Sequence, residues 1–229
     1  MGLAMLGAVS QGILWGIMVL GVFITYKLLD IADLTVDGSF ALGGSVCAVL
    51  VVGGVDPLVA ILAAMVAGMV AGAVTGFLHT VFEIPAILAG ILTQIGLWSI
   101  NLRIMGKSNT PLLQNDTIFS RVTDLTGLST NVGSIIVGLV VAVVIIGTEI
   151  GSACRATGNN EAMVRALGVN TKVTKMIALV LSNGLVGLSG GLICESQKYA
   201  DIGMGTGAIV IGLAAIVIGE VLWRILPGA

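Results

Sequence analysis

The sequence predicts an all-α fold, a polytopic bundle of transmembrane helices with one short cytoplasmic helix. Of its 229 residues, 57% are hydrophobic and only 10% are charged, and the mean hydropathy is +1.12. An ordinary soluble domain carries about 25% charged residues. Charge-free runs near the ~20 apolar residues that cross a bilayer core recur along the chain. These observations predict a single integral-membrane domain over residues 1–229.

Seven apolar runs are predicted to be membrane spans. They are residues 3–26, 38–55, 57–82, 84–102, 130–148, 176–194 and 202–219. The second run is short and follows the acidic sequence DIADLTVDGS. We therefore keep open a broken or partly inserted second helix, which exists at membrane depth only where protein or water covers its free backbone groups.

Small residues are expected to hold the bundle together. The chain has 33 glycines, and aromatic residues make up only 4%. Gly68, Gly72 and Gly76 recur every fourth residue and form a smooth strip on one helix face, where another backbone can approach closely. The sixth and seventh runs are also rich in glycine, which suits helices that bend or slide and equally suits simple packing.

Few polar groups lie in or beside the spans. Gln94, Ser182 and Asn183 are the candidate substrate-pathway residues, because a small polar solute needs hydrogen-bonding groups at membrane depth. A Ser-Asn pair inside a helix can instead bond to a neighbouring helix. Glu195 and Glu220 are further pathway candidates, because buried carboxylates are costly unless they are paired or face water. Both lie near run ends, where they can also reach the interface.

Catalytic, metal and nucleic-acid sites are not expected. His79 is the sole histidine, so no Ser/His/Asp or Cys/His set can be assembled. Asp30, Asp33 and Asp37 lack the alternate spacing and distal Glu of a calcium loop, and we interpret them as a solvated turn at the interface. The net charge of −2 gives no basis for binding nucleic acid.

Residues 151–175 form the most polar segment between two apolar runs. Asn159 or Asn160 can cap a helix start, Glu161 suits the positive end of its dipole, and Gly168 can close its last turn. The resulting helix of about two turns is too short to be stable alone. We therefore expect a partner protein to hold it.

The charge count orients the chain. If each run crosses once, six basic residues lie on the side of 151–175 and four lie opposite, which favours that side as cytoplasmic. The N-terminus and residues 101–130 then lie outside. An amphipathic element around 117–122 is expected to provide a binding surface for a soluble partner there; the alternative is a simple connecting loop.

The segment GSACRATGNNEAMVRALGVNTKVTK, with the Gly-rich helix after it, resembles the coupling region of the branched-chain amino acid and ribose type of ABC importer permease. The upstream sequence DLTVDGSFALGGSVCAVL resembles another segment of that family, in which a polar turn enters a central helix. Within the family, LDIADLTVDGSF and INLRIMGKSNTPLL are most similar to permeases thought to serve aromatic amino acids. The strict E-A-A-x-x-x-G wording of the coupling motif is absent.

The resemblance implies a permease subunit of an ATP-driven, binding-protein-dependent importer of a small polar solute, an amino acid, in the bacterial inner membrane. It implies a second permease copy, two ATPase subunits that bind ATP and Mg²⁺, and an extracytoplasmic binding protein, with no cofactor on this chain. It assigns the ATPase contact to Arg155, Gly158, Asn160, Glu161, Arg165 and Gly168.

Two alternatives remain open at this point: an ion-coupled secondary transporter or channel, and a membrane scaffold that transports nothing. Permeases of this type continue for about two helices beyond the seventh span. The sequence is therefore expected to be truncated at its C-terminus.

Overall fold

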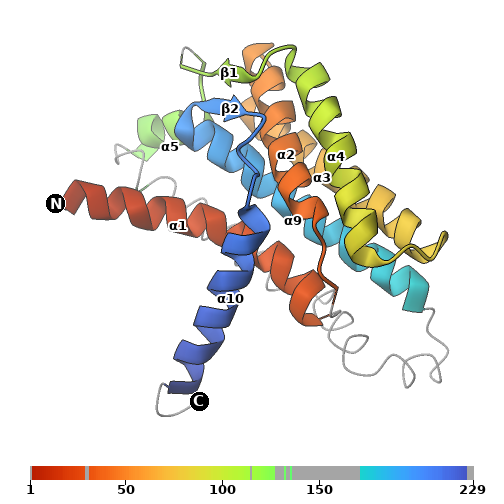
Figure 1. Ribbon diagram of the computed structural model, residues 1–229. Helices are drawn as coiled ribbons and strands as arrows, with labels where there is room; N and C mark the ends of the chain where they lie inside the picture. The colour runs from red at the N-terminus through yellow and green to blue at the C-terminus, as the bar shows by residue number, and fades with distance from the viewer. Residues whose placement is uncertain are drawn as a thin grey trace.

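The computed structural model describes residues 2–28, 31–113, 115–126, 132, 135 and 171–225, and most of them are helical. A π-helical turn, η1 (Ile24–Leu28), directly continues the first helix. The helices are α1 (Gly2–Phe23), α2 (Thr35–Val52), α3 (Pro57–Thr80), α4 (Ala86–Met105), α5 (Ile118–Thr126), α9 (Thr171–Gln197) and α10 (Ala208–Ile225) (Figure 1). The predicted all-α bundle is confirmed.

Six of the seven predicted spans correspond to described helices. Helices α1, α2, α3, α4 and α9 are long and apolar enough to cross a membrane, whereas the apolar part of α10 is shorter. The fifth predicted span, 130–148, lies outside the described residues except for positions 132 and 135. The second span is one continuous helix, so the broken helix that we kept open for it is not found.

Local sequence explains the ends of α3 and α4. The Asp56 carboxylate accepts a hydrogen bond from the Leu58 amide at 3.0 Å, and Pro57 occupies the first helical position, where its missing N–H costs nothing. Helix α4 ends at Gly106, whose φ of 65° is left-handed, a conformation that glycine adopts without a steric penalty.

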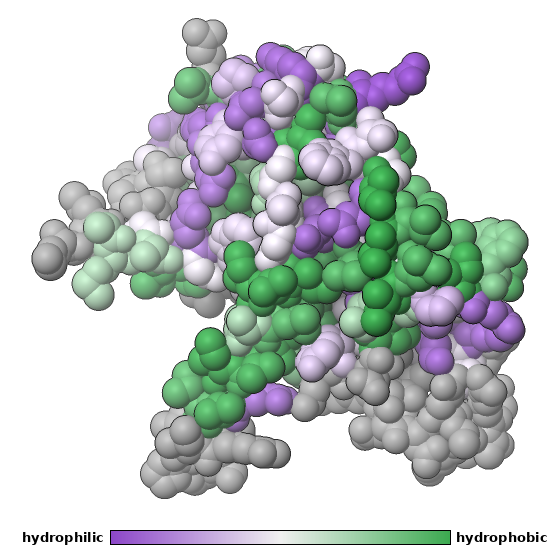
Figure 2. All heavy atoms as spheres, viewed as in Figure 1, coloured by the Kyte–Doolittle hydropathy of each residue, from purple (hydrophilic) through white to green (hydrophobic). Residues whose placement is uncertain are grey.

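A small two-stranded sheet lies at one end of the bundle. Strand β1 (Asn109–Pro111) pairs antiparallel with β2 (Tyr199–Asp201). In Figure 2, hydrophilic residues gather at this end, over β1 and β2, and hydrophobic residues cover much of the side of the molecule. This is the pattern of a protein whose sides face lipid and whose end faces water.

Helix α9 is the centre of the bundle, and α2 and α3 both pack along it. A Cβ atom added at Gly72 would lie 2.9 Å from Asn183 Cβ and would also meet the Leu179 carbonyl, and one at Gly76 would lie 3.2 Å from Met176 Cγ. The glycine strip of α3 therefore lies against α9. Real Cβ contacts almost never fall below 3.0 Å, so the two backbones are in direct contact.

Gly68 continues this strip towards the N-terminal end of α3. A Cβ atom there would lie 3.1 Å from Gly187 Cα on α9. Gly187 is also where α2 arrives from the other side, because a Cβ atom at Gly43 would meet its backbone. Three helices thus meet at one level through glycine.

A buried polar network joins α2 to α9. Asn183 on α9 accepts a hydrogen bond from the Ser39 hydroxyl at 2.6 Å and donates one to Asp33 Oδ2 at 2.6 Å. Asp33 Oδ1 accepts from the Thr35 amide at 2.9 Å, and the Thr35 hydroxyl lies 2.7 Å from that of Thr75 on α3. All five residues are buried, so the start of α2 is fixed to two helices by groups that have no access to water.

We expect Gly72→Leu to lower the free energy of unfolding by roughly 1–3 kcal/mol, because overpacking forces neighbouring groups apart. Thermal unfolding in detergent measures this loss. Gly12→Leu is the matched control, since nothing lies within 4 Å of a Cβ atom there. Equal unfolding temperatures for the two variants would contradict direct contact between the α3 and α9 backbones.

We expect Asp33→Ala to destabilise the protein by about 1–3 kcal/mol, because buried donors at Thr35 and Asn183 lose their acceptor. Asp33→Asn keeps an acceptor for the Thr35 amide and should cost less. Denaturant titration of both variants in detergent tests this order. An alanine variant as stable as the wild type would mean that the network contributes nothing to the fold.

Candidate functional site

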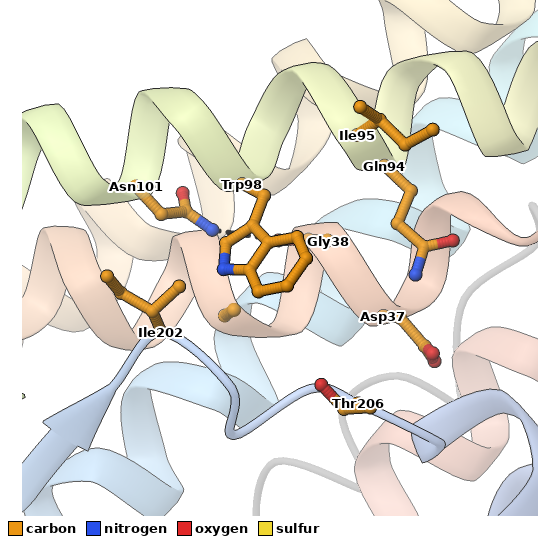
Figure 3. Close-up of a pocket in the computed structure, with 9 residues that line it drawn as sticks. Asp37, Gly38, Gln94, Ile95, Trp98, Asn101, Ile202 and Thr206 are labelled. Carbon is orange, nitrogen blue, oxygen red and sulfur yellow. Dashed lines mark hydrogen bonds between the residues drawn. The ribbon is translucent and has the colours of Figure 1, made fainter. Parts of the chain in front are cut away.

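A pocket of about 210 Å³ opens between α2, α4 and the segment that precedes α10 (Figure 3). Most of its polar side chains are uncharged, and they alternate with apolar ones. The lining residues are Asp37, Gly38, Ala41, Gln94, Ile95, Trp98, Asn101, Ile202 and Thr206.

The pocket lies near the middle of the membrane crossing. Gln94 is the ninth residue of α4, which begins at Ala86 and has 20 residues, so it lies about 12 Å from the start of the helix at 1.5 Å per residue. Gly38 of α2 packs at this level, since a Cβ atom there would lie 3.2 Å from Gln94 Cα. Solutes that cross the membrane beside α4 would therefore pass this level.

Helix α10 begins at the same depth. Asp37 of α2 accepts hydrogen bonds from the amides of Gly207 and Ile209, both at 2.9 Å. The carboxylate thereby satisfies free amides at the start of α10 and places negative charge at the positive end of its dipole. A side chain from one helix thus caps another helix inside the bundle.

The chain between β2 and α10 is not helical. Residues 202–207 form turns, and Gly205 packs so closely on α2 that a Cβ atom would meet the Asp37 carbonyl. We placed the last apolar run near 202–219, and its helix, α10, starts at Ala208, so the first six residues of the run lie before the helix. Irregular backbone is tolerated at membrane depth where protein buries it or where it lines a cavity; Gly205 is buried, and Ile202 and Thr206 line the pocket.

Several polar groups in the pocket are available to a solute. In Figure 3 the Gln94 side chain extends from α4 towards Asp37, and the Trp98 indole lies across the pocket. Within the described part of the chain, no hydrogen bond is found for the Gln94 amide, the Trp98 N–H or the Thr206 hydroxyl. The Asn101 amide is satisfied by backbone groups, since its nitrogen donates to the Leu97 carbonyl and its oxygen accepts from the Leu42 amide, both at 3.2 Å.

Of the three predicted pathway residues, Gln94 lines the pocket. Ser182 and Asn183 are fully buried in α9. The Ser182 hydroxyl donates to the Gly21 carbonyl of α1 at 2.7 Å, and Asn183 belongs to the network with Asp33 and Ser39. Both therefore make the contact between helices that we left open as their alternative role.

Of the three acidic residues expected in a solvated turn, Asp30 lies outside the described residues, and Asp33 and Asp37 are not solvated. Asp33 is 2% exposed, and Asp37 is partly buried as the cap of α10. Burial raises the pKa of Asp33, and hydrogen bonds from Thr35 and Asn183 oppose that rise. The expectation was wrong for these two positions because their partners lie 150 and 170 residues away.

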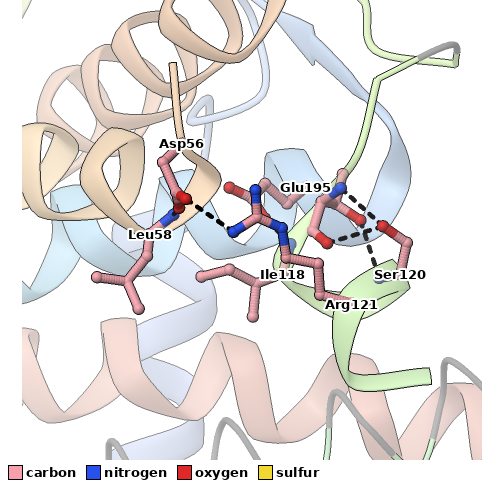
Figure 4. A network of polar contacts seen from close by, with 7 residues as sticks. Asp56, Leu58, Ile118, Ser120, Arg121 and Glu195 are labelled. Carbon is pink, nitrogen blue, oxygen red and sulfur yellow. Dashed lines mark hydrogen bonds and ion pairs between the residues drawn. The ribbon is translucent and has the colours of Figure 1, made fainter. Parts of the chain in front are cut away.

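Glu195 has a structural role near the C-terminal end of α9 (Figure 4). Its side chain is fully buried, and Oε2 accepts from the Ile118 amide at the start of α5 at 2.8 Å. Cys47 Sγ lies 3.5 Å from Oε1. A carboxylate suits this helix start for the same reason that Asp37 suits α10. Glu220, the other predicted carboxylate, is exposed on α10.

Helix α5 is fixed at the end that carries β1 and β2. Thr117 and Ser120 cap its start through reciprocal side-chain bonds to each other's amides, and Arg121 pairs with Asp56 at 2.8 Å. The Arg121 hydrogen bond holds the pKa of the Asp56 carboxyl below its ordinary value. Both partners are about half exposed, so the pair adds little stability but fixes α5 beside the α2–α3 turn.

Only the last five residues of the predicted coupling segment, 171–175, are described, and they lie at the opposite end of the bundle. Residues 151–170, which include all six predicted ATPase contacts, fall outside the described part of the chain. The rest of the segment forms the first turn of α9, where Lys172 Nζ lies 2.9 Å from Glu83 Oε1 in the α3–α4 connection. The Lys172 partner holds the pKa of Glu83 below its ordinary value.

Comparison with known proteins covers nearly the whole chain. The family model described as the branched-chain amino acid transport system / permease component matches residues 4–229. A tyrosine transport system permease protein of Clostridioides difficile (strain R20291) is 38% identical over 219 residues, which are 96% of this chain and 74% of that protein.

Two further relatives are more distant. An uncharacterized protein of Rickettsia prowazekii (strain Madrid E) is 32% identical over 93% of this chain and 75% of its own length. A ribose import permease protein of Escherichia coli (strain K12) is 30% identical over 82% of this chain and 60% of its own length. No solved structure matches.

These matches agree with the five described helices that are apolar and long enough to cross a membrane. The chain belongs to the permease components of branched-chain amino acid and ribose type ABC importers, multi-pass proteins of the bacterial inner membrane.

Proposed function

We propose that this permease imports an amino acid, driven by ATP hydrolysis on two separate ATPase subunits. The observation that carries this proposal is the similarity to a tyrosine transport system permease, which extends over 96% of the chain. An extracytoplasmic binding protein would deliver the substrate to the end that carries α5, β1 and β2. ATP and Mg²⁺ would bind to the ATPase subunits, so this chain would need no cofactor of its own.

Two copies of the chain would form the membrane pathway between them. In this proposal, Gln94 contacts the substrate at mid-depth, while Ser182 and Asn183 hold α1 and α2 on α9 during transport. The path would run along α2 and α4, which carry most of the residues that line the pocket. Glycine contacts favour sliding of one helix on another, because no side chain interlocks the two backbones there.

Helix α9 would transmit the motion of the ATPase. It runs for 27 residues, from Thr171 in the predicted coupling segment to Gln197, two residues after the buried Glu195, and it packs on α1, α2 and α3. Closure of the ATPase dimer would move the helix at residues 160–167, and α9 would carry this displacement into the bundle as a rigid element. The Lys172–Glu83 pair would extend the displacement to the α3–α4 connection.

Arg165→Glu should uncouple ATP hydrolysis from uptake, because it reverses a charge in the predicted ATPase contact. The full importer in proteoliposomes should lose most uptake, while its binding protein still docks on the outer face. Arg103→Glu, an exposed change at the outer end of α4, is the matched control for charge reversal. Normal substrate-stimulated turnover of the Arg165 variant would count against the coupling role.

Cysteine labelling separates the two kinds of pathway candidate. In a cysteine-free importer, a cysteine at Gln94 should react with a small water-soluble thiol reagent, and ATP should change the rate. A cysteine at Ser182 should stay protected in every nucleotide state, because this position lies in a dry helix contact. If the cysteine at 182 were labelled and the cysteine at 94 were protected, the path would lie at the α1–α9 contact and not in the α4 pocket.

A further inference from the structure

We propose that the pocket beside α4 binds the ammonium group of the transported solute on Asp37 and its apolar side chain on Trp98. The inference rests on the proposed function and names the chemistry by which this chain would recognise its substrate inside the membrane. The ligand class is a zwitterionic amino acid with an aromatic or aliphatic side chain. Three properties of the pocket select that class.

The first property is charge. Asp37 is the one charged side chain among the lining residues. Its carboxylate accepts two hydrogen bonds from amides of α10, and because a carboxylate has about four acceptor positions, it can accept further hydrogen bonds. The described part of the chain places no basic residue in the lining. A cationic group therefore complements this pocket, and at membrane depth it needs such a partner.

The second property is the lack of an anion site at the start of α10. The Gly207 and Ile209 amides donate to Asp37, the Ala208 amide donates to the Gly205 carbonyl, and the Val210 amide donates to the Gly207 carbonyl. The first turn thus has no amide to spare for a solute carboxylate. The donors that remain are neutral, namely the side chains of Gln94, Trp98 and Thr206, so the anionic end of the solute would lie at Gln94 and Thr206, beyond the indole face.

The third property is the apolar wall. The Trp98 side chain is 62% exposed on α4, and Ile95 and Ile202 line the pocket with it. An indole face attracts both an apolar side chain and a nearby cation. The volume of about 210 Å³ lies below the ~300–1,000 Å³ of sites for drug-sized ligands, as expected for a solute of amino-acid size.

Trp98 also provides the probe. The chain has three tryptophans, Trp15, Trp98 and Trp223, so changing the other two to phenylalanine leaves Trp98 as the only tryptophan of this chain, and the same importer with Trp98→Phe as well gives the background from the other subunits. In the full importer in nanodiscs, L-phenylalanine or L-leucine should change its fluorescence saturably. Phenethylamine, which keeps the ammonium, should compete, whereas 3-phenylpropionate, which lacks it, should compete at least about tenfold more weakly.

Asp37→Asn should weaken the fluorescence response at least about tenfold, and Asp124→Asn, an exposed change on α5, should leave it unchanged. Because Asp37 also caps α10, Trp98→Ala serves as a second variant: its side chain is mostly exposed, so it should keep the wild-type unfolding temperature but lose amino-acid uptake. Suppose that the wild type imports amino acids while its Trp98 fluorescence does not respond, and that Trp98→Ala keeps full uptake. These results would overturn this site, while the proposed function would stand. Equal competition by 3-phenylpropionate overturns the role of Asp37, and an importer that takes up no amino acid refutes the proposed function itself.

Discussion

Direct contact between helix backbones is the constraint on which the rest of this structure depends. Lipid tails are as apolar as the side chains of the spans, so burial of apolar surface does not drive one helix onto another in a bilayer. The bundle relies instead on glycines. Gly68 and Gly72 of α3, and Gly43 of α2, bring both helices onto the backbone of α9. At this separation polar side chains of α2 and α9 can also meet, as Ser39 and Asn183 do.

This packing determines where the pocket forms. Once Asn183 fixes the start of α2 against α9, Asp37, the third residue of α2, lies beside the middle of α4. From that position its carboxylate can satisfy the first amides of α10. The chain can therefore continue from β2 into the bundle without helical hydrogen bonds and begin α10 there. The cap, the interruption and the pocket are consequences of one arrangement.

The sequence predicts the spans well because span length and apolar composition are local properties. The glycine strip of α3 could also be predicted from local sequence, because a spacing of four residues places its members on one helix face. The roles of Asp33, Asp37 and Glu195 were hidden because each depends on a partner 77 to 170 residues away. The interruption at 202–207 was missed because its glycines and threonine do not interrupt the apolar run.

The structure also shows how the two ends of the bundle are connected. At one end, Lys172 joins α9 to the α3–α4 connection. At the other, Glu195 joins α9 to α5, and Arg121 joins α5 to the turn before α3. A rigid shift of α9 would therefore reach the end that carries α5, β1 and β2 as well as the pocket. Opening to one side and closing to the other require such a link, because both ends must respond to a single displacement.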